Sequence, residues 1–285
     1  MSRIAYVNGR YLPAREACVN VEDRGYQFAD GVYEVCEVRN GRLIDAPRHL
    51  ARLERSLREL RITQPMTLTA LQFVMQETVR RNRVDQGLVY LQVTRGVARR
   101  DHPFPLQPIA PSVVVTSRNV NPAKAQENAS KGIAVITTPE NRWPRVDIKS
   151  VSLLPNVLAK QAAREAGAYE AWYVDPQGQV TEGSSSNAWI VTKDGRVVTR
   201  HTDNFILAGI TRAVLKNVLE ALQLRLEERA FTPSEAYEAA EAFVSSAGQL
   251  VMPVVKIDGR AIGDGKPGSV AKRLREEFHR FAHVS

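Results

Sequence analysis

Short turns that contain glycine join apolar runs along this chain, and they limit the folds that it can adopt. The clearest of them are Asn8-Gly9, Asn40-Gly41, Pro176-Gln177-Gly178 and Lys193-Asp194-Gly195. Turns of this kind connect neighbouring antiparallel strands in hairpins. The sequence therefore predicts antiparallel pairing rather than the strict strand–helix alternation of a dinucleotide-binding fold.

Helices are predicted between these strands. Behind Pro47, leucines recur every three or four residues and give one apolar stripe, at Leu50, Leu53, Leu57 and Leu60. Further helices are expected at residues 68–81, 155–166, 211–222, 233–242 and 269–282. Because helices and strands mix in both halves of the chain, we expect an α+β fold.

The domain organisation predicted from the sequence has two parts. Residues 1–118 are expected to form a small N-terminal α/β domain, and residues 132–285 a large C-terminal domain. The polar stretch 119–131 is interpreted as the linker between them. A ligand site is expected between the two domains, since ligands often bind at domain interfaces.

Charge and hydropathy exclude several functions. The net charge is +8, but basic and acidic residues alternate, as in segments 51–60 and 271–280, so we expect solvated helix faces and no nucleic-acid partner. A positive field suits anionic small molecules. No apolar run is long enough to cross a membrane and no secretory signal is visible, so a cytoplasmic location without membrane association is expected.

The chain has two cysteines, Cys18 and Cys36. Neither has the neighbouring histidine or cysteine that a metal site needs, and no metal is predicted. Both are expected to be small buried residues.

Three segments could carry chemistry, and each has an ordinary interpretation as well. Lys149 is flanked by apolar residues, where an amine can serve as a nucleophile, although most such lysines extend to the surface. The run TEGSSSN, residues 181–187, offers hydroxyl and N–H groups to an anion, or is a polar loop. The run GITR, residues 209–212, opens a helix whose N-terminus favours a phosphate, or is a common helix start.

Together these segments resemble a known family. DIKSVSLLPNVLAKQ, TEGSSSN and GITR stand in the order and spacing of pyridoxal-phosphate enzymes of fold type IV. EDRGYQFADGVYEV, HLARLERS and TRGVARRDHPFP extend the resemblance over nearly the whole chain. The family includes D-amino acid aminotransferases, branched-chain aminotransferases and aminodeoxychorismate lyase, and the sequence is most similar to the bacterial D-amino acid aminotransferases.

The resemblance implies pyridoxal 5'-phosphate as the cofactor, held mainly by the C-terminal domain. Lys149 matches the lysine that forms the Schiff base and then moves a proton as the catalytic base. Glu182 matches the partner of the pyridine nitrogen, which keeps that nitrogen protonated. Arg52 matches a phosphate ligand. The remaining cofactor contacts that it implies are Ser185, Ser186, Ile210, Thr211, Ser246 and Ala247.

Substrate choice is also implied by the resemblance. Arg100, His102 and Tyr33 match the residues that bind the α-carboxylate in D-amino acid aminotransferases, which we call the carboxylate trap. In that family the Arg–His pair comes from the neighbouring subunit, so a homodimer is implied. The expected reaction is ping-pong transamination between a D-amino acid, such as D-alanine or D-glutamate, and a 2-keto acid, such as 2-oxoglutarate or pyruvate.

Two positions depart from the family pattern. Position 29 is alanine where the family usually has glycine, and Ala247 lacks a hydroxyl that touches the phosphate in the family, a role that Ser246 could take over.

The alternative functions are a branched-chain L-amino acid aminotransferase, an aminodeoxychorismate lyase, and a non-catalytic basic binding protein of the same fold. The Arg100–His102 pair argues against the first two, and the presence of Lys149 and Glu182 against the third.

Overall fold

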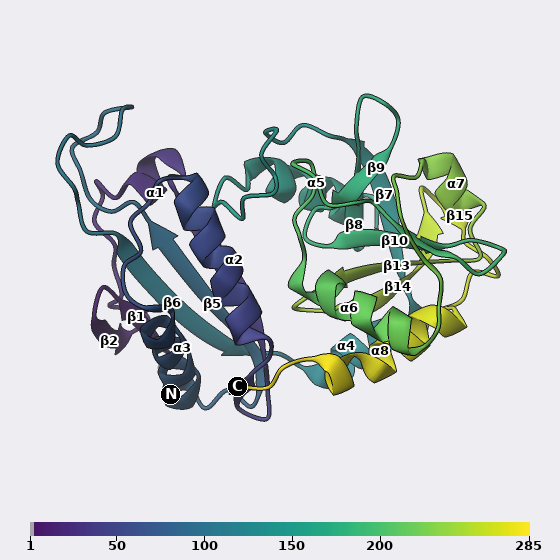
Figure 1. The fold of residues 1–285 in the computed structure, drawn as a ribbon, viewed down its shortest axis with the longest axis horizontal. Coiled ribbons are helices and arrows are strands. Elements are labelled where there is room, and N and C mark those ends of the chain that lie inside the picture. The colour runs from purple at the N-terminus through teal and green to yellow at the C-terminus, as the bar shows by residue number, and fades with distance from the viewer. Residues whose placement is uncertain (1–2) are drawn as a thin grey trace. The chain divides into compact units, whose positions relative to one another are not determined.

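The computed structural model describes residues 3–285 and divides the chain into two compact units (Figure 1). The first unit contains Met1–Asn121 together with Ile148–Ser152 and His283–Ser285. The second contains Pro122–Asp147 and Leu153–Ala282. Each unit has its own sheet, and both sheets carry helices, so the predicted α+β fold class is confirmed.

The first unit is built on a six-stranded antiparallel sheet in the order β2-β1-β6-β5-β3-β4. The predicted hairpins at Asn8-Gly9 and Asn40-Gly41 are confirmed, and all four residues have the positive φ that a tight hairpin turn needs. The strands are β1 (Ile4–Val7), β2 (Arg10–Pro13), β3 (Gly31–Arg39), β4 (Arg42–Leu43), β5 (Gln86–Thr94) and β6 (Ser112–Asn119).

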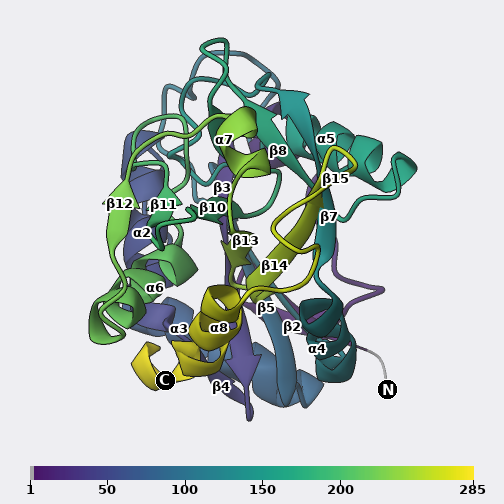
Figure 2. The same ribbon diagram turned by 90° about the vertical axis from the view of Figure 1, so that its right-hand side faces the viewer.

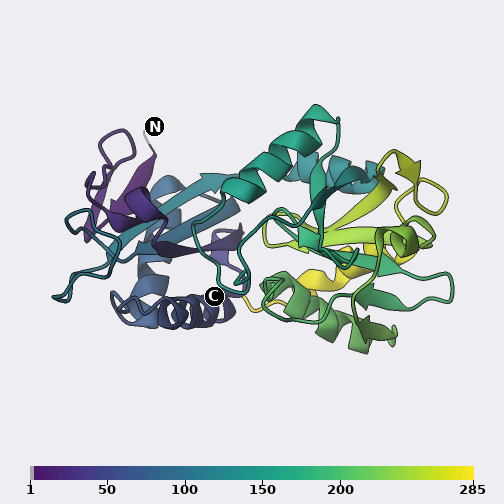
Figure 3. The same ribbon diagram turned by 90° about the horizontal axis from the view of Figure 1, so that it is seen from above.

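Helices α2 (Ala46–Glu59) and α3 (Leu68–Asn82) cover this sheet, and Figure 3 shows both on the same side of it. The predicted leucine stripe faces the sheet, since Leu50, Leu53 and Leu57 are buried and Leu60 is partly buried. A short helix, α1 (Arg24–Phe28), begins at the N-cap Asp23, whose carboxylate accepts a hydrogen bond from the Gly25 N–H.

The second unit has a nine-stranded mixed sheet in the order β12-β11-β10-β13-β14-β7-β8-β9, with β15 paired to β14. The two hairpins predicted here, β8–β9 and β10–β11, are confirmed as antiparallel pairs. The strands are β7 (Ile133–Pro139), β8 (Glu170–Val174), β9 (Val180–Gly183), β10 (Asn187–Val191), β11 (Val197–Thr199), β12 (Leu226–Glu228), β13 (Glu241–Ser246), β14 (Leu250–Ile257) and β15 (Arg260–Ala261).

Helices pack on this sheet from several places in the sequence. α4 (Pro122–Lys131) packs on β14, and α5 (Leu154–Glu165) on β7 and β8. α6 (Ile210–Ala221) and α8 (Ser269–Phe281) pack against each other and on β13, as Figure 2 shows for the two helices. α7 (Pro233–Tyr237) is a short helix before β13.

Three local expectations differ from the structure. Most of the segment interpreted as a linker, residues 119–131, is helical (α4), because alanines and charged residues of good helix propensity outweigh its polar character. The helix expected at residues 233–242 stops at Tyr237, since β13 starts at Glu241 and pairs with β10. Cys36 is buried as expected, but the expectation for Cys18 is wrong, because it lies on an exposed loop.

Two features are absent from the described residues. No helix within residues 3–285 combines the length and apolar character that a membrane span requires. Over the same residues, no group of three or more His, Cys, Asp and Glu side chains could hold a metal ion.

Candidate active site

The segment around Lys149 runs beside strand β3. The Tyr33 N–H donates to the Lys149 carbonyl over 3.0 Å, and the Val151 N–H donates to the Gly31 carbonyl over 3.0 Å. Ile148 anchors the segment in the core of the first unit. This pairing brings Nζ of the half-buried Lys149 to 4.2 Å from the centroid of the Tyr33 ring. Two residues that the sequence predicts for the site therefore lie side by side.

Arg52 projects from α2 to a carboxylate on β3. Its Nε and Nη2 each donate to Glu34 over 2.8 Å, a bidentate pair in which the Glu34 side chain is fully buried. Nδ1 of His49 lies 2.7 Å from the same carboxylate. Burial alone would raise the pKa of Glu34, but the charge and hydrogen bonds of Arg52 lower it to about 2.

Glu34 and His49 were missed by the sequence reasoning. A signal was available, because Glu34 stands in an apolar-alternating strand at a position that faces the core. Burial lowers the pKa of His49, although its hydrogen bond to Glu34 acts in the opposite direction. The neutral ring therefore donates its Nδ1–H to Glu34, and the network fixes the orientation of the Arg52 guanidinium.

Arg100 and His102 lie on the loop between β5 and β6, which extends beside α1 (Figure 1). Both are exposed. The Arg100 guanidinium lies 4.7 Å from the centroid of the Phe28 ring, and the His102 ring lies 5.5 Å from it. The structure therefore brings the predicted Arg–His pair together on one aromatic ring, which the sequence reasoning did not identify.

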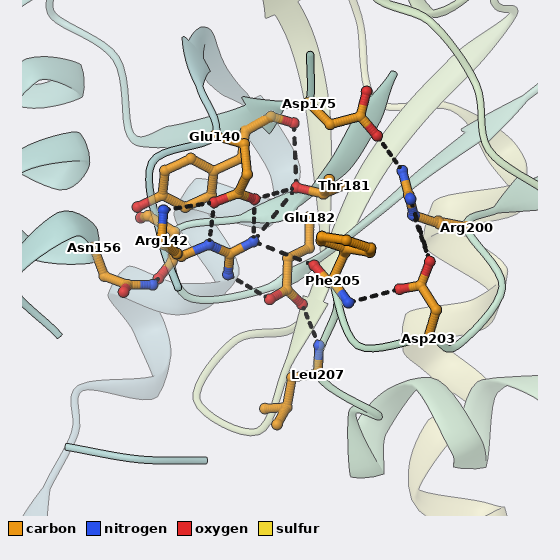
Figure 4. Close-up of polar contacts among 12 residues, drawn as sticks. Glu140, Arg142, Asn156, Asp175, Thr181, Glu182, Arg200, Asp203, Phe205 and Leu207 are labelled. Atoms are coloured by element: carbon orange, nitrogen blue, oxygen red, sulfur yellow. Dashed lines mark hydrogen bonds and ion pairs between the residues drawn. The ribbon is translucent and has the colours of Figure 1, made fainter. Parts of the chain in front are cut away.

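In the second unit, Glu182 on β9 is surrounded by hydrogen-bond donors (Figure 4). Oε1 accepts from Arg142 over 2.6 Å, while Oε2 accepts from the Asn187 amide over 3.0 Å and the Leu207 N–H over 3.1 Å. Glu182 is only 5% exposed. A guanidinium and N–H donors all favour the ionised carboxylate, which is the form that a pyridinium partner needs.

Arg142 connects Glu182 with a second carboxylate. It donates through Nη2 and Nε to Glu140 over 2.6 and 2.8 Å, and Thr181 donates to Glu140 over 2.8 Å (Figure 4). Burial alone would lower the pKa of Arg142, but the hydrogen bonds and charges of Glu140 and Glu182 raise it. The sequence reasoning missed Arg142, because only the paired strands bring it beside Glu182.

The serines of the TEGSSSN run form hydrogen bonds with the buried carboxylate of Glu170. Ser185 donates its hydroxyl to Glu170 over 2.8 Å and Ser186 over 3.2 Å, and Ser184 donates to the same side chain. Lys160 pairs with Glu170 over 3.2 Å. A serine hydroxyl has a single proton. The hydroxyls of Ser185 and Ser186 therefore donate their hydrogen bonds to Glu170 in this structure. An anion at this run would be bound by backbone N–H groups instead.

Ile210 and Thr211 begin helix α6, whose N-cap is Gly209. Because glycine has no side chain to cap the helix, the first N–H groups of α6 have no side-chain cap acceptor, as an anion site requires. Asn187 ties this turn to Glu182, since its amide also donates to the Leu207 carbonyl over 3.0 Å. The TEGSSSN and GITR runs therefore meet in the second unit.

Ser246 is the last residue of β13, and Ala247 follows it where the chain turns into β14. Both are half-buried. Strand pairing sets Ser245, the residue before them, opposite Asn187, and α6 packs on β13. The turn therefore lies at the same end of the sheet as the Glu182–Asn187 pair.

Comparison with known proteins identifies the family. The family model described as Amino-transferase class IV matches residues 31–257. The chain belongs to the class IV aminotransferases. A D-alanine aminotransferase from Bacillus licheniformis is 41% identical over 269 residues, which cover 94% of this chain and 93% of that protein. One from Staphylococcus haemolyticus is 39% identical over 277 residues, covering 97% of this chain and 96% of that protein.

Solved structures with this class IV fold include branched-chain aminotransferases. The Escherichia coli enzyme matches with a TM-score of 0.91 at 21% identity, covering 98% of this chain and 94% of that one, which shows the fold alone. A branched-chain amino acid aminotransferase from T.th., solved with pyridoxamine 5'-phosphate, matches with a TM-score of 0.89 at 28% identity and the same coverage.

Proposed function

We propose that this class IV aminotransferase binds pyridoxal 5'-phosphate and moves amino groups between D-amino acids and 2-keto acids. The observation that carries the proposal is the similarity of 38–41% identity to proteins named D-alanine aminotransferase, over 94–97% of the chain. The chain also retains Lys149 and Glu182, the two residues on which the chemistry depends in the family.

The side chains present fit the cofactor. Lys149 offers a primary amine beside the Tyr33 ring, and Glu182 is an anion held by Arg142. The N-terminus of α6 and the guanidinium of Arg52 suit a phosphate. When bound, the cofactor supplies an electron sink that stabilises negative charge at the substrate Cα.

The chain's own residues would do the rest. Lys149 Nζ would take the proton from the substrate Cα and later return one to a neighbouring carbon of the cofactor. Glu182 would keep the pyridine nitrogen protonated, because its own negative charge is fixed by Arg142. Arg100, His102 and Tyr33 would bind the substrate carboxylate, which orients the Cα–H bond toward Lys149 and so selects the D-enantiomer.

A homodimer is part of the proposal. The carboxylate trap includes Arg100 and His102 on an exposed loop, with Leu106 fully exposed beside them and Tyr26 of α1 76% exposed. Exposed apolar side chains next to functional residues favour burial against a partner, and a second copy of this chain would present the same surface.

A cytoplasmic location is also proposed, and the free Cys18 on an exposed loop suits a reducing compartment.

The first experiment pairs a spectrum with an assay. The visible absorbance of the purified protein is recorded, and D-alanine and L-leucine are then supplied separately, each with 2-oxoglutarate. We expect an absorbance band that shifts on adding D-alanine, and turnover with D-alanine only. Turnover with L-leucine alone would instead favour the branched-chain alternative and overturn the role given to Arg100 and His102. A colourless protein without turnover would reject the enzyme.

Variants then test the assigned residues. Lys149→Ala is expected to abolish the band and turnover, whereas Lys131→Ala, a surface lysine paired with Glu127, should match the wild type. Arg100→Ala should raise KM for D-alanine at least tenfold, about the worth of a charge-assisted hydrogen bond. Arg99→Ala removes the same charge one residue away and serves as its control. Equal losses in both arginine variants would contradict the carboxylate trap.

A further inference from the structure

The loop that carries Arg100 and His102 closes around a buried arginine. Arg24, whose side chain is 4% exposed, donates through Nη1 to the carbonyls of Asp101 over 2.7 Å and Pro103 over 3.3 Å. Its Nη2 donates to the His102 carbonyl over 3.2 Å. One planar guanidinium thus satisfies consecutive carbonyls of the segment 101–103, and this fixes the path of the backbone through the segment.

Arg24 pairs with a carboxylate of the same unit, which it shares with a second arginine. Nε of Arg24 donates to Asp30 over 2.9 Å, and Arg95 donates to both oxygens of Asp30 over 2.6 and 3.0 Å. Arg95 also donates to the carbonyls of Leu60 and Arg61 over 2.8 Å each, just after helix α2. The loop is therefore tied through Arg24, Asp30 and Arg95 to the end of the helix that carries Arg52.

The side chains of the loop are oriented by a ring. Phe28 lies 4.7 Å from the Arg100 guanidinium, 4.8 Å from that of Arg24, and 5.5 Å from the His102 ring. A cation over an aromatic face is held without using its N–H donors, so Arg100 keeps its fork available for a carboxylate. Phe28 is half-buried at the end of α1, where its backbone is fixed by the helix.

We propose that Arg24 and Phe28 are positioning residues for the carboxylate trap, an inference that rests on the proposed function. Arg24 fixes the backbone of residues 101–103, and Phe28 orients the side chains of Arg100 and His102. Neither touches the substrate. Both set the affinity for the α-carboxylate, and the chemical step at Lys149 does not depend on them.

Arg24→Lys tests the backbone part. A lysine keeps the charge for Asp30, but its single ammonium cannot reproduce the planar fork to three carbonyls. Trypsin cleavage of the holoenzyme after Arg99 should become at least tenfold faster, because a loop freed from Arg24 fits a protease site more readily. KM for D-alanine should rise about tenfold with a smaller change in kcat. The matched control is Arg229→Lys in the other unit, where the arginine also donates to a carbonyl, that of Ala230, and to a carboxylate, that of Glu235.

Phe28→Leu and Phe28→Tyr test the ring. The leucine variant keeps the apolar volume without the aromatic face, and KM for D-alanine should rise by about three- to tenfold, in line with the loss of a cation–π contact. The tyrosine variant retains the face and should restore the wild-type KM. The half-reaction rate with ethylamine, which lacks a carboxylate, should change little in every variant.

The outcomes separate the two proposals. An unchanged rate of trypsin cleavage after Arg99 in Arg24→Lys, or equal losses with D-alanine and ethylamine, would overturn the positioning role. A tyrosine variant as impaired as the leucine variant would overturn the part given to Phe28. If the wild type does not use D-alanine at all, the proposed function fails, and the cleavage measurement still decides whether Arg24 holds the loop.

Discussion

Gly209 leaves the space in which the side-chain amide of Asn187 lies: a Cβ at position 209 would fall on the oxygen of that amide. The backbone of Gly209 has an ordinary negative φ of −63°, so this glycine is required by packing rather than by its own conformation. Asn187 in turn donates to Glu182. The glycine of the GITR run therefore helps to orient the carboxylate of the TEGSSSN run.

Gly209→Ala should displace Asn187 and weaken cofactor binding. Overpacking of this kind costs about 1–3 kcal/mol of stability. We expect a lower urea midpoint and a cofactor dissociation constant raised several-fold, measured by absorbance titration. In the double variant Asn187→Ala/Gly209→Ala the clash is gone, so the two losses should be less than additive. Additive losses would show that the two residues act independently.

Glu34 and Arg52 should make the first unit sensitive to acid. The pKa of Glu34 is about 2 in the folded protein against an ordinary 4.5. The stabilisation is therefore fully present above about pH 4.5 and is lost as the pH falls toward 2. The pKa of His49 is also lowered from its ordinary value of 6.5. The free energy of unfolding therefore falls further below about pH 6.5, because the unfolded state binds this proton before the folded state does. Urea unfolding across pH 7 to 3 measures this decline.

The Glu34→Gln variant tests the same pair at neutral pH. It leaves the Arg52 charge buried without its counter-ion, and such a loss typically costs about 3–5 kcal/mol. Glu77 gives the control, because its partners Arg80 and Arg81 on α3 are exposed to water. Water screens these pairs, so Glu77→Gln should hardly move the midpoint. Similar shifts in both variants would argue against a special role for the buried pair.

Ala29→Gly should stabilise the protein. Ala29 ends helix α1 in the left-handed region, with φ of 55°, where an alanine is strained and glycine is not. The left-handed region costs a residue with a Cβ about 1–2 kcal/mol, and the greater chain entropy of glycine offsets part of that relief. We therefore expect a gain of up to about 1 kcal/mol in the free energy of unfolding, from urea midpoints. Ala29→Val, with its branched Cβ, should lower stability instead. A glycine variant less stable than the wild type would contradict the strain.

Arg142→Lys should slow the chemical step. Lysine can reach Glu140 or Glu182 but cannot bind both as the arginine fork does. With Glu182 less firmly held, kcat should fall by about 10- to 100-fold, the worth of a hydrogen bond to a charged group, while KM for D-alanine changes less. Steady-state kinetics measure both constants. Arg196→Lys, a surface pair with Asp194, should keep the wild-type kcat.

Ala247→Thr should tighten cofactor binding. A threonine returns to the β13–β14 turn the hydroxyl that this chain lacks, and a hydrogen bond to a phosphate is worth about 1.5–3 kcal/mol. The cofactor dissociation constant should fall about tenfold by absorbance titration. If Ser246 already fills that role, Ser246→Ala will weaken binding and Ala247→Thr will leave the dissociation constant unchanged, which would count against a deficit at Ala247.

Local patterns were enough for much of the fold. The glycine turns predicted the hairpins, because Asn-Gly pairs such as Asn8-Gly9 and Asn40-Gly41 readily adopt the positive φ that a tight hairpin turn needs. The leucine stripe predicted α2, since its spacing matches a single helix face. Segment 122–131 was not predicted as a helix, because only Ala129 of it is buried and no apolar stripe marks it.

The sequence by itself determined the residue types of the site: an amine at Lys149, a carboxylate at Glu182, and the Arg100–His102 pair. Tertiary structure decided what surrounds them. Strand pairing sets Lys149 beside Tyr33, and only the folded chain gives Glu182 its partner Arg142. These contacts join residues far apart in the chain, so no local pattern records them, and a buried charge is tolerated only where the folded chain supplies its partner.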